Sequence, residues 1–596
     1  MDLSSRQRRR ALALVLSLGV LITLWRLGAT GVVDETPPLF AAAGRAMAST
    51  GDWLTPRVNG LPRFDKPPLV YWLMGFAYAL PGRAAWDPLG SWAARLPSAL
   101  ATIGLMFALA DTLVLWPQHQ DRSPRRTAVI GALVFGLSPL VLVWSRTAVS
   151  DALLCGLVGI SLLMQWRRYA DPSRTPWLAA WFTLGLAVLA KGPVAVVLSG
   201  LVLLLFGALS RDLGTLWQRL RPIPGLLLTA LISLPWYVLE LLVEGKPFWD
   251  SFFGYHNLQR FTSVVNDHLQ PWWFFGPVML VAAMPFTPFL LVGLVNVPRR
   301  RLPPAQSLHQ FAACWLLAVL VLFTSAATKL PSYWLPATPA SALLVALATL
   351  RPDRWQRLAW WGSVVLIALL AAGFWGASIW VPWINDPEMP TLSMDLLASG
   401  DVSRAAIWFT LAALIGLALL LQRRKAGVGL LAMLVPLLLF HLTALVPISE
   451  LADQLRQAPV RDAAERMIQQ RRPDEPLAMV GAMKPSLHFH TGEVIVFEGR
   501  SDGALVNLSD RLSHERRRGW QGRPLGTEHA VDSVLILIDK GTAAQKHWRD
   551  LSPTHLGSFG IYELWRLDRH RLQLRAKSLE QEGVRADWQE PRPERF

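Results

Sequence analysis

Long apolar runs recur from near the N-terminus to about residue 446, and they decide what this chain can fold into. Of its 596 residues, 52% are hydrophobic and only 17% are charged, whereas soluble domains carry about 25% charged residues. Many runs approach or exceed the roughly 18 residues that indicate a membrane-spanning helix. The sequence therefore predicts a polytopic α-helical membrane protein with about 13 spans. Their approximate positions are 11–31, 91–115, 127–145, 150–166, 177–190, 192–208, 223–241, 272–297, 308–326, 333–350, 358–380, 404–421 and 426–446.

The loops between these runs fix the expected orientation. If the N-terminus lies in the cytoplasm, every cytoplasmic loop is rich in arginine, as the positive-inside rule requires. An odd number of spans then puts the C-terminal region outside. The net charge of +16 follows from this loop pattern, so it does not indicate a nucleic-acid-binding protein. The basic loops contain Arg6, Arg8, Arg9 and Arg10; Arg122, Arg125 and Arg126; Arg167, Arg168 and Arg174; Arg211, Arg219 and Arg221; Arg299, Arg300 and Arg301; Arg351, Arg354 and Arg357; and Arg423, Arg424 and Lys425.

The chain divides into two regions by composition. Residues 1–446 are predicted to form the transmembrane domain, in which 32–90 make a long first outer loop with interfacial helices. Residues 447–596 are polar and contain short β-like runs, "EVIVFEG" and "SVLILIDK", together with helix-like segments. This second region is predicted to be a small soluble α/β domain outside the membrane.

Ionisable residues near membrane depth are candidates for a functional site, because charge is expensive to bury in a bilayer. In the predicted topology such residues fall in five outer segments, which are expected to converge on one site. These segments hold Asp34, Glu35, Asp65 and Lys66; Arg146 and Asp151; Lys191; His256 and Arg260; and Lys329 with Tyr333.

The residue types favour chemistry on a phosphorylated substrate. Carboxylates suit a general base or a metal site, and lysine and arginine supply charge-assisted hydrogen bonds to a phosphate. Each group also has a purely structural alternative. Asp34 and Glu35 could cap a helix, Arg146 and Asp151 could form an ion pair, Lys191 could reach for the membrane interface, and His256 could be an ordinary loop histidine.

Several motifs carry a resemblance to a known family. The pieces are "DET" at 34–36, "GDWLTPRVNGLPRFDKPPLVYWL" at 51–73, "SRTAVSDALL" at 145–154, "LAKGPVAV" at 189–196, "HNLQRF" at 256–261, "QPWWFF" at 270–275 and "TKLPSYWLPATP" at 328–339. In this order they resemble the bacterial aminoarabinose transferases that modify lipid A and, more broadly, the protein O-mannosyltransferase-like membrane glycosyltransferases. The resemblance covers roughly residues 10–350.

The resemblance implies a GT-C glycosyltransferase fold and an inverting sugar transfer from a polyprenyl phosphate. Asp34 falls at the family's catalytic aspartate, and Glu35 and Asp151 are counted with it as catalytic candidates. The lipid phosphate would lie near Lys66, Lys191, Arg260 and Tyr333. Lys329 is added to this set because it lies in one of the five outer segments. Asp65 and His256 fall at a metal-associated pair, so a divalent metal (zinc, magnesium or manganese) is implied. Two departures stand out: Asp65 replaces a glutamate that is frequent in the family, and the register at Asp34 needs a two-residue insertion.

The expected function is therefore an inverting glycosyltransferase that uses a polyprenyl-phosphate sugar. Its acceptor would be a lipid A-like glycolipid or a protein on the periplasmic side of the inner membrane. The alternative is a lipid or sugar transporter or flippase without catalysis. Such a protein is expected to carry charged groups at mid-membrane and internal repeats, and neither is found in the sequence.

Overall fold

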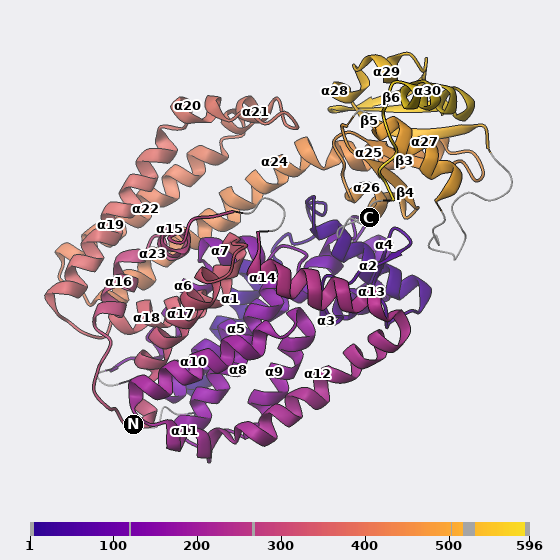
Figure 1. Cartoon of the computed structure of the whole chain (residues 1–596). Helices are drawn as coiled ribbons and strands as arrows, with labels where there is room; N and C mark the ends of the chain where they lie inside the picture. The colour runs from indigo at the N-terminus through magenta and orange to yellow at the C-terminus, as the bar shows by residue number, and fades with distance from the viewer. Residues whose placement is uncertain (1–4, 119–120, 265–268, 502, 516–530, 590–596) are drawn as a thin grey trace.

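The computed structural model describes residues 5–118, 121–264, 269–501, 503–515 and 531–589 (Figure 1). Up to residue 456 the chain is almost entirely helical. The main helices of this part are α1 (Ser5–Leu24), α5 (Ser91–Leu115), α6 (Pro124–Gly136), α7 (Pro139–Trp144), α8 (Asp151–Ala170), α9 (Trp177–Lys191), α10 (Val194–Ser210), α11 (Leu213–Leu220), α12 (Pro222–Glu244), α15 (Phe275–Ala282), α16 (Thr287–Val295), α17 (Leu308–Thr324), α18 (Thr338–Ala348), α19 (Arg354–Trp375), α22 (Asp401–Leu421) and α23 (Ala426–Phe440).

Five helical segments of the described part are long and apolar enough to cross a membrane, or six if the bent pair α15 and α16 is one span. The chain is therefore a multi-pass membrane protein. The expected count of about 13 spans is not confirmed. Several of the predicted spans are shorter apolar helices, such as α9 with 15 residues and α10 and α17 with 17 each.

Two predicted continuous spans are broken in the structure. The run 127–145 divides into α6 and α7 at Ser138, whose backbone is extended with ψ 133°. Pro139 follows it, and the residue before a proline is disfavoured in helical geometry. The run 272–297 divides into α15 and α16, which meet at an angle of 114°.

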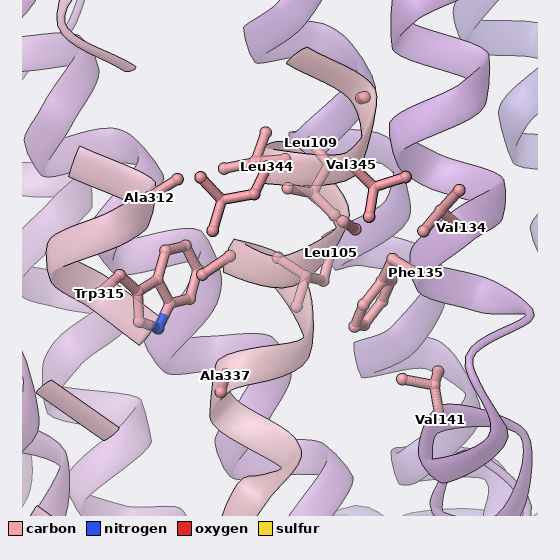
Figure 2. Close-up of a cluster of buried hydrophobic side chains, with 14 of the residues drawn as sticks. Leu105, Leu109, Val134, Phe135, Val141, Ala312, Trp315, Ala337, Leu344 and Val345 are labelled. Atoms are coloured by element: carbon pink, nitrogen blue, oxygen red, sulfur yellow. The ribbon is translucent and has the colours of Figure 1, made fainter. Parts of the chain in front are cut away.

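The helices pack around one large apolar core. Its buried side chains include Leu105 and Leu109 of α5, Trp315 of α17 and Leu344 of α18, which lie together in Figure 2. At Gly293 a Cβ atom would lie 2.7 Å from the Leu344 carbonyl oxygen, so α16 and α18 approach closely there. Helices α19 and α22 lie side by side at the left of Figure 1 and contribute buried side chains such as Trp360 and Phe409 to the same core.

The first outer loop has its own folded structure. It contains α2 (Pro37–Thr50), the strands β1 (Arg57–Val58) and β2 (Leu61–Pro62), α3 (Leu69–Tyr78) and α4 (Arg83–Trp86). Asn59 and Gly60 connect the strands with φ of 53° and 77°, as the Asn-Gly sequence favours in a tight hairpin. A second outer segment holds α13 (Lys246–Phe248), the π-helix η1 (Trp249–Gln259) and α14 (Arg260–Thr262), and a third is the 3₁₀ helix η3 (Pro331–Ala337) before α18.

The C-terminal region forms a mixed five-stranded sheet covered by helices. The strand order is β4-β3-β5-β7-β6, with β3 parallel to β4 and β5 and the remaining pairs antiparallel. All seven residues of β5 are buried, because α25 and α26 cover one face and α27 and α30 the other. The elements are α24 (Val446–Arg456), α25 (Ala458–Gln470), β3 (Leu477–Val480), α26 (Ser486–Thr491), β4 (Ile495–Glu498), α27 (Ala504–His514), β5 (Ser533–Asp539), α28 (Lys540–Ala543), α29 (Lys546–Arg549), β6 (Thr554–Phe559), β7 (Tyr562–Asp568) and α30 (Arg569–Gln581).

Helix α24 connects the two parts. It continues from α23 through a π-helical turn at His441–Leu445 and ends beside the sheet unit (Figure 1). Gly31, between α1 and α2, donates its backbone N–H to Asp453 of α24 at 2.7 Å. The C-terminal unit is thus attached to the start of the first outer loop as well as to the last span.

Candidate active site

A cavity of about 1090 Å³ lies between the helix bundle and the outer segments. It is called the outer cavity here. The outer cavity is lined by eight of the ten residues that the sequence proposed for the site. They are Glu35, Asp65, Lys66, Asp151, Lys191, His256, Arg260 and Tyr333.

Four cationic side chains from three separate segments face the outer cavity. Lys66 follows strand β2, Lys191 ends α9 and Arg260 begins α14, while Arg63 follows the hairpin and was not proposed from the sequence. Burial, together with the nearby charges of Arg260, Lys191 and Arg63, lowers the pKa of Lys66 to about 8 against the opposite effect of Asp65. Crowded cations of this kind favour a bound anion.

Lys191 and Asp151 form an ion pair across the ends of two antiparallel helices. The Lys191 Nζ atom lies 2.8 Å from an Asp151 carboxylate oxygen. Lysine ends α9 and aspartate begins α8, and each position is favourable for its charge in the helix dipole. Lys191 also lies 5.5 Å from the ring centroid of Tyr333. The structural alternative for these residues, an ion pair between Arg146 and Asp151, is wrong. Arg146 donates instead to the carbonyl oxygens of Thr23 and Arg26.

Gly192 lets the chain turn directly after Lys191. Its φ is +91°, which side chains rarely adopt, and a Cβ atom would lie 3.2 Å from Phe252 of η1. Pro193 then begins the approach to α10. The Lys-Gly-Pro sequence thus places a charged side chain at the cavity and reverses the chain in the next two residues.

Asp65 is held as a carboxylate by three neighbours. Arg63 lies 2.6 Å from one carboxylate oxygen, the Tyr71 hydroxyl donates to the other at 2.8 Å, and Lys66 lies 3.9 Å away. Burial alone would raise the pKa of Asp65, but Arg63 and Lys66 outweigh it and hold the pKa well below its usual range. Asp65 therefore neutralises part of the cationic cluster.

The surroundings of Asp65 and His256 favour an electrostatic role for Asp65, and the divalent metal expected at this pair stays a prediction. Both Asp65 oxygens already accept hydrogen bonds from Arg63 and Tyr71, and the surrounding charges are positive. Burial, with the neighbouring charge of Lys66, lowers the pKa of His256 to about 3, so the imidazole is neutral. In the part of the chain that the structure describes, no group of three His, Cys, Asp or Glu side chains could hold a metal ion.

Asp34 lies beside the outer cavity: its neighbour Glu35 and Pro485, which precedes its partner Ser486, line the cavity, and Asp34 itself does not. Its carboxylate accepts hydrogen bonds from the backbone N–H of Ser486 at 2.9 Å and from the Ser486 hydroxyl at 2.5 Å. Asp34 does not cap α2, because Thr36 precedes that helix and makes no side-chain cap hydrogen bond; instead Asp34 accepts from the first backbone N–H of α26. Burial raises the pKa of Asp34 to about 6, against the opposite effect of the Ser486 hydrogen bonds. Its neighbour Glu35 lines the cavity.

Lys329 does not join the cationic cluster, contrary to the sequence-based expectation. Thr328 and Leu330 line the outer cavity and Lys329 does not, although its side chain is buried. The segment is extended here, since Thr328 forms a β-bridge with Leu269 and Leu330 has φ −129° and ψ 148°. Alternate side chains of an extended segment point to opposite sides, so the lysine faces away from its two neighbours.

Two residues of the site were missed from the sequence. Arg63 lines the outer cavity and belongs to the same "RFDK" run as Asp65 and Lys66, so its position in that run was an available signal. Ser486 lies in the C-terminal region, 452 residues from Asp34, and no local pattern connects the two.

Two family models match parts of the chain. Residues 65–238 match the dolichyl-phosphate-mannose-protein mannosyltransferase family. Residues 470–583 match the C-terminal domain of cyanobacterial RgtA-type glycosyltransferases. The first match contains Asp65, Lys66, Asp151 and Lys191, and the second contains Ser486.

Individual proteins also match the chain in sequence. The undecaprenyl phosphate-alpha-4-amino-4-deoxy-L-arabinose arabinosyl transferase of Pseudomonas aeruginosa strain UCBPP-PA14 is 31% identical over 375 residues, which are 61% of this chain and 62% of that relative. The match thus spans less than two thirds of the relative's length. An uncharacterized protein of Aquifex aeolicus is 31% identical over 323 residues, which are 54% of this chain and 68% of that protein.

The fold is that of a solved transferase. The crystal structure of ArnT from Cupriavidus metallidurans bound to undecaprenyl phosphate superposes with a TM-score of 0.73, covering 93% of this chain and 97% of that one at 22% identity. The apo structure of the same protein gives a TM-score of 0.70. The GT-C-type architecture expected from the sequence is confirmed, and so is the resemblance to the aminoarabinose transferase-like and protein O-mannosyltransferase-like membrane glycosyltransferases.

Proposed function

We propose that this chain, which resembles the aminoarabinose transferase-like membrane glycosyltransferases, is an inverting glycosyltransferase that uses a polyprenyl-phosphate sugar. The observation that carries the proposal is the gathering of Lys66, Lys191 and Arg260, from three separate segments, on one cavity together with carboxylates. A buried set of like charges is costly without an anionic partner. A lipid phosphodiester reaching the cavity from the bilayer supplies that partner.

The proposed reaction follows from the charges on the cavity wall. Lys66, Lys191 and Arg260 hold the donor phosphate, and Tyr333 lies against Lys191. The bond between the anomeric carbon and the phosphate oxygen breaks, and its electron pair stays on that oxygen. The cations stabilise the negative charge that develops there. An acceptor oxygen bonds to the anomeric carbon from the opposite face, which inverts its configuration.

The acceptor proton needs a base when the acceptor is a hydroxyl. Asp34 is the proposed base, because a pKa of about 6 keeps it ionised at neutral pH while leaving it able to take a proton. Glu35 is the alternative base on the cavity wall. If the acceptor group is itself a phosphate, no proton has to be removed, and Asp34 orients it. Asp151 acts through Lys191 by holding its ammonium group in place.

The metal role expected for Asp65 and His256 is replaced in this proposal by an electrostatic one. Asp65 offsets the charge of Arg63 and Lys66, and neutral His256 lines the cavity between them and Arg260. The phosphate is then held by cationic side chains alone.

The proposed placement in the cell follows the loop charges. The chain lies in the inner membrane with its N-terminus in the cytoplasm and about 13 spans in residues 1–446. The C-terminal unit, 447–596, is proposed to be periplasmic. The donor is a polyprenyl-phosphate sugar of the undecaprenyl type, and the acceptor is a lipid A-like glycolipid or a protein. Similarity to transferases favours this proposal over a transporter or flippase.

The proposal is tested by mass spectrometry of envelope lipids and glycoproteins from cells with and without the chain. A species heavier by one sugar is expected only when the intact chain is present. The Lys191→Ala variant should insert normally and lack that species. If all species are unchanged while purified chain moves labelled lipid between leaflets of a vesicle, the transporter alternative is correct instead.

A further inference from the structure

Among the described residues, the hydrogen bonds to the Asp34 carboxylate come from the C-terminal unit. Ser486 opens helix α26 and donates both its backbone N–H, at 2.9 Å, and its hydroxyl, at 2.5 Å, one to each carboxylate oxygen. Ser486 is fully buried. Two donors on two oxygens fix the plane of a carboxylate as well as its position, so Asp34 cannot rotate without breaking one of them.

The turn that carries Ser486 is itself fixed by ion pairs. Lys484 donates to both oxygens of Glu388 at 2.8 Å, and Arg456 of α24 donates to the same carboxylate at 2.7 Å. Lys484 is 2% exposed, so this pair is shielded from water and strong in consequence. Glu388 belongs to the outer loop between α19 and α22. Residues 484–486 are therefore tied both to that loop and to the helix leading out of the bundle.

The C-terminal unit also forms part of the outer cavity. Pro485 lines the cavity beside Glu35. On the other side of this turn, Phe489 of α26 is buried in the apolar cluster formed by α2 and α3, and Arg45 of α2 lies 4.5 Å from its ring centroid. The hairpin residue Asn59 exchanges two hydrogen bonds of 2.8 Å with the backbone of Ile495 in β4. The C-terminal unit thus packs against the first outer loop through both apolar contacts and hydrogen bonds.

We propose that the C-terminal α/β unit completes the catalytic site, with Ser486 acting as a positioning residue for Asp34 and the Lys484–Glu388 pair fixing the turn that presents it. This inference rests on the proposed function, in which Asp34 serves the transfer reaction. It assigns a specific role to the C-terminal unit, for which the transmembrane motifs suggest none. Residues 484–486 are then needed for turnover, as are the residues that line the cavity.

The two Ser486 hydrogen bonds act on the charge of Asp34 as well as on its direction. They stabilise the carboxylate against burial, and Lys484 adds a favourable positive charge, while Glu35 opposes it. Tyr562 of β7 is a further titratable group near Asp34. Removing the Ser486 hydroxyl therefore raises the pKa of Asp34, and a base with a higher pKa is protonated at a higher pH.

The test compares purified Ser486→Ala and Ser486→Thr variants with the parent chain, and uses Ser513→Ala as the matched control. Ser513 lies on α27 of the same unit, and its hydroxyl bonds only within that helix, to the Ser509 carbonyl oxygen, among the described contacts. Ser486→Ala should lower transfer at neutral pH by roughly tenfold, the scale of one charge-assisted hydrogen bond. It should also move the acid limb of the rate upward in pH. Binding of undecaprenyl phosphate should stay unchanged, Ser486→Thr should restore the rate, and Ser513→Ala should match the parent.

A second variant guards against misfolding. Glu388→Gln releases the turn without contacting Asp34, so it should lower transfer; because the lost Glu388 charge leaves more of the Lys484 charge to act on Asp34, the rate at neutral pH is the readout for this variant. If Asp34→Asn is inactive while neither Ser486→Ala nor Glu388→Gln changes the rate or its acid limb, Ser486 does not position Asp34 and the inference is overturned. If Asp34→Asn transfers sugar at the parent rate, the proposed role of Asp34 fails instead, whatever the Ser486 variants do.

Discussion

At the scale of single residues, the pKa of Lys66 gives the phosphate site a measurable signature. Burial and the neighbouring cations lower the pKa of Lys66 to about 8, and a bound phosphodiester keeps its single negative charge over this range. Only the protonated lysine binds it well, so affinity is full below the pKa of the free site and is lost above it. Binding of a polyprenyl-phosphate sugar should weaken by about tenfold between roughly pH 7 and roughly pH 9.

Calorimetric or fluorescence titration with the donor lipid checks this expectation. Lys66→Arg is the control, because its guanidinium stays charged throughout and should remove most of the pH dependence. A parent chain with flat affinity from neutral to alkaline pH would contradict the assignment of Lys66 to the phosphate.

Asp34 offers the second residue-scale prediction. Asp34→Asn keeps the size of the side chain and removes its charge, so the chain should insert normally while transfer to a hydroxyl acceptor falls by about a hundredfold or more. In the parent chain, the rate should fall as the pH drops through about 6, since the base must be ionised. Glu35→Gln tests the neighbouring carboxylate in the same assay. Parent-like turnover of Asp34→Asn with an inactive Glu35→Gln would transfer the role of base to Glu35.

The surroundings of Asp65 lead to a prediction about metal ions. Because Arg63 and Tyr71 occupy its two oxygens, transfer should be insensitive to EDTA, and added zinc, magnesium or manganese should not stimulate it. The readout is the initial rate of sugar transfer by chelator-treated protein. A rate that is lost on chelation and restored by one of these ions would reinstate Asp65 and His256 as metal ligands.

At the scale of elements, the turn between α9 and α10 controls where Lys191 points. Gly192→Ala forces a side chain into φ +91° and brings its Cβ within 3.2 Å of Phe252. The variant should bind donor lipid at least about tenfold more weakly, as expected when a backbone shift of several tenths of an ångström displaces a charged ligand group. Gly200→Ala in the following helix, α10, is the control, because nothing lies within 4 Å of its added Cβ. Equal donor affinity in both variants would show that the turn does not determine where Lys191 points.

The elements also show what the sequence could and could not predict. Helix α5 has the predicted bounds, 91–115, because a single apolar run sets both its ends. Strands β4 and β5 lie within the β-like runs at 493–499 and 533–540, since their apolar residues have no helical period. The broken spans were missed because hydropathy does not register a proline turn inside an apolar run.

Within the site, too, some residues could be predicted from the sequence and others could not. Residues in specific local motifs, such as Lys66 and Lys191, could be assigned to one cavity from topology alone. Lys329 could not be excluded in this way, because its direction depends on the extended backbone at 328–330. The partner of Asp34 depends on tertiary contact between residues 34 and 486, and no periodicity or spacing encodes such a contact.

At the scale of the whole molecule, the orientation can be tested by thiol labelling. Cys155 and Cys314 are buried, so single cysteines introduced elsewhere report their own location. Cysteines at 60, 255, 390 and 465 should react with an impermeant reagent in cells whose periplasm is accessible. Cysteines at 122, 300 and 424 should react only after the membrane is permeabilised. Labelling of the second group before permeabilisation would reverse the proposed orientation and separate the outer segments from the periplasm.

The distance in sequence between Asp34 and Ser486 has a consequence for biosynthesis. The ribosome makes the first outer loop early and the residues of α26 after more than three quarters of the chain. The carboxylate has no hydroxyl to bind until the last of these segments has emerged, crossed the membrane and folded. A chain released before that moment would lack both Ser486 hydrogen bonds to Asp34, so under the proposed mechanism it should not consume lipid-linked sugar.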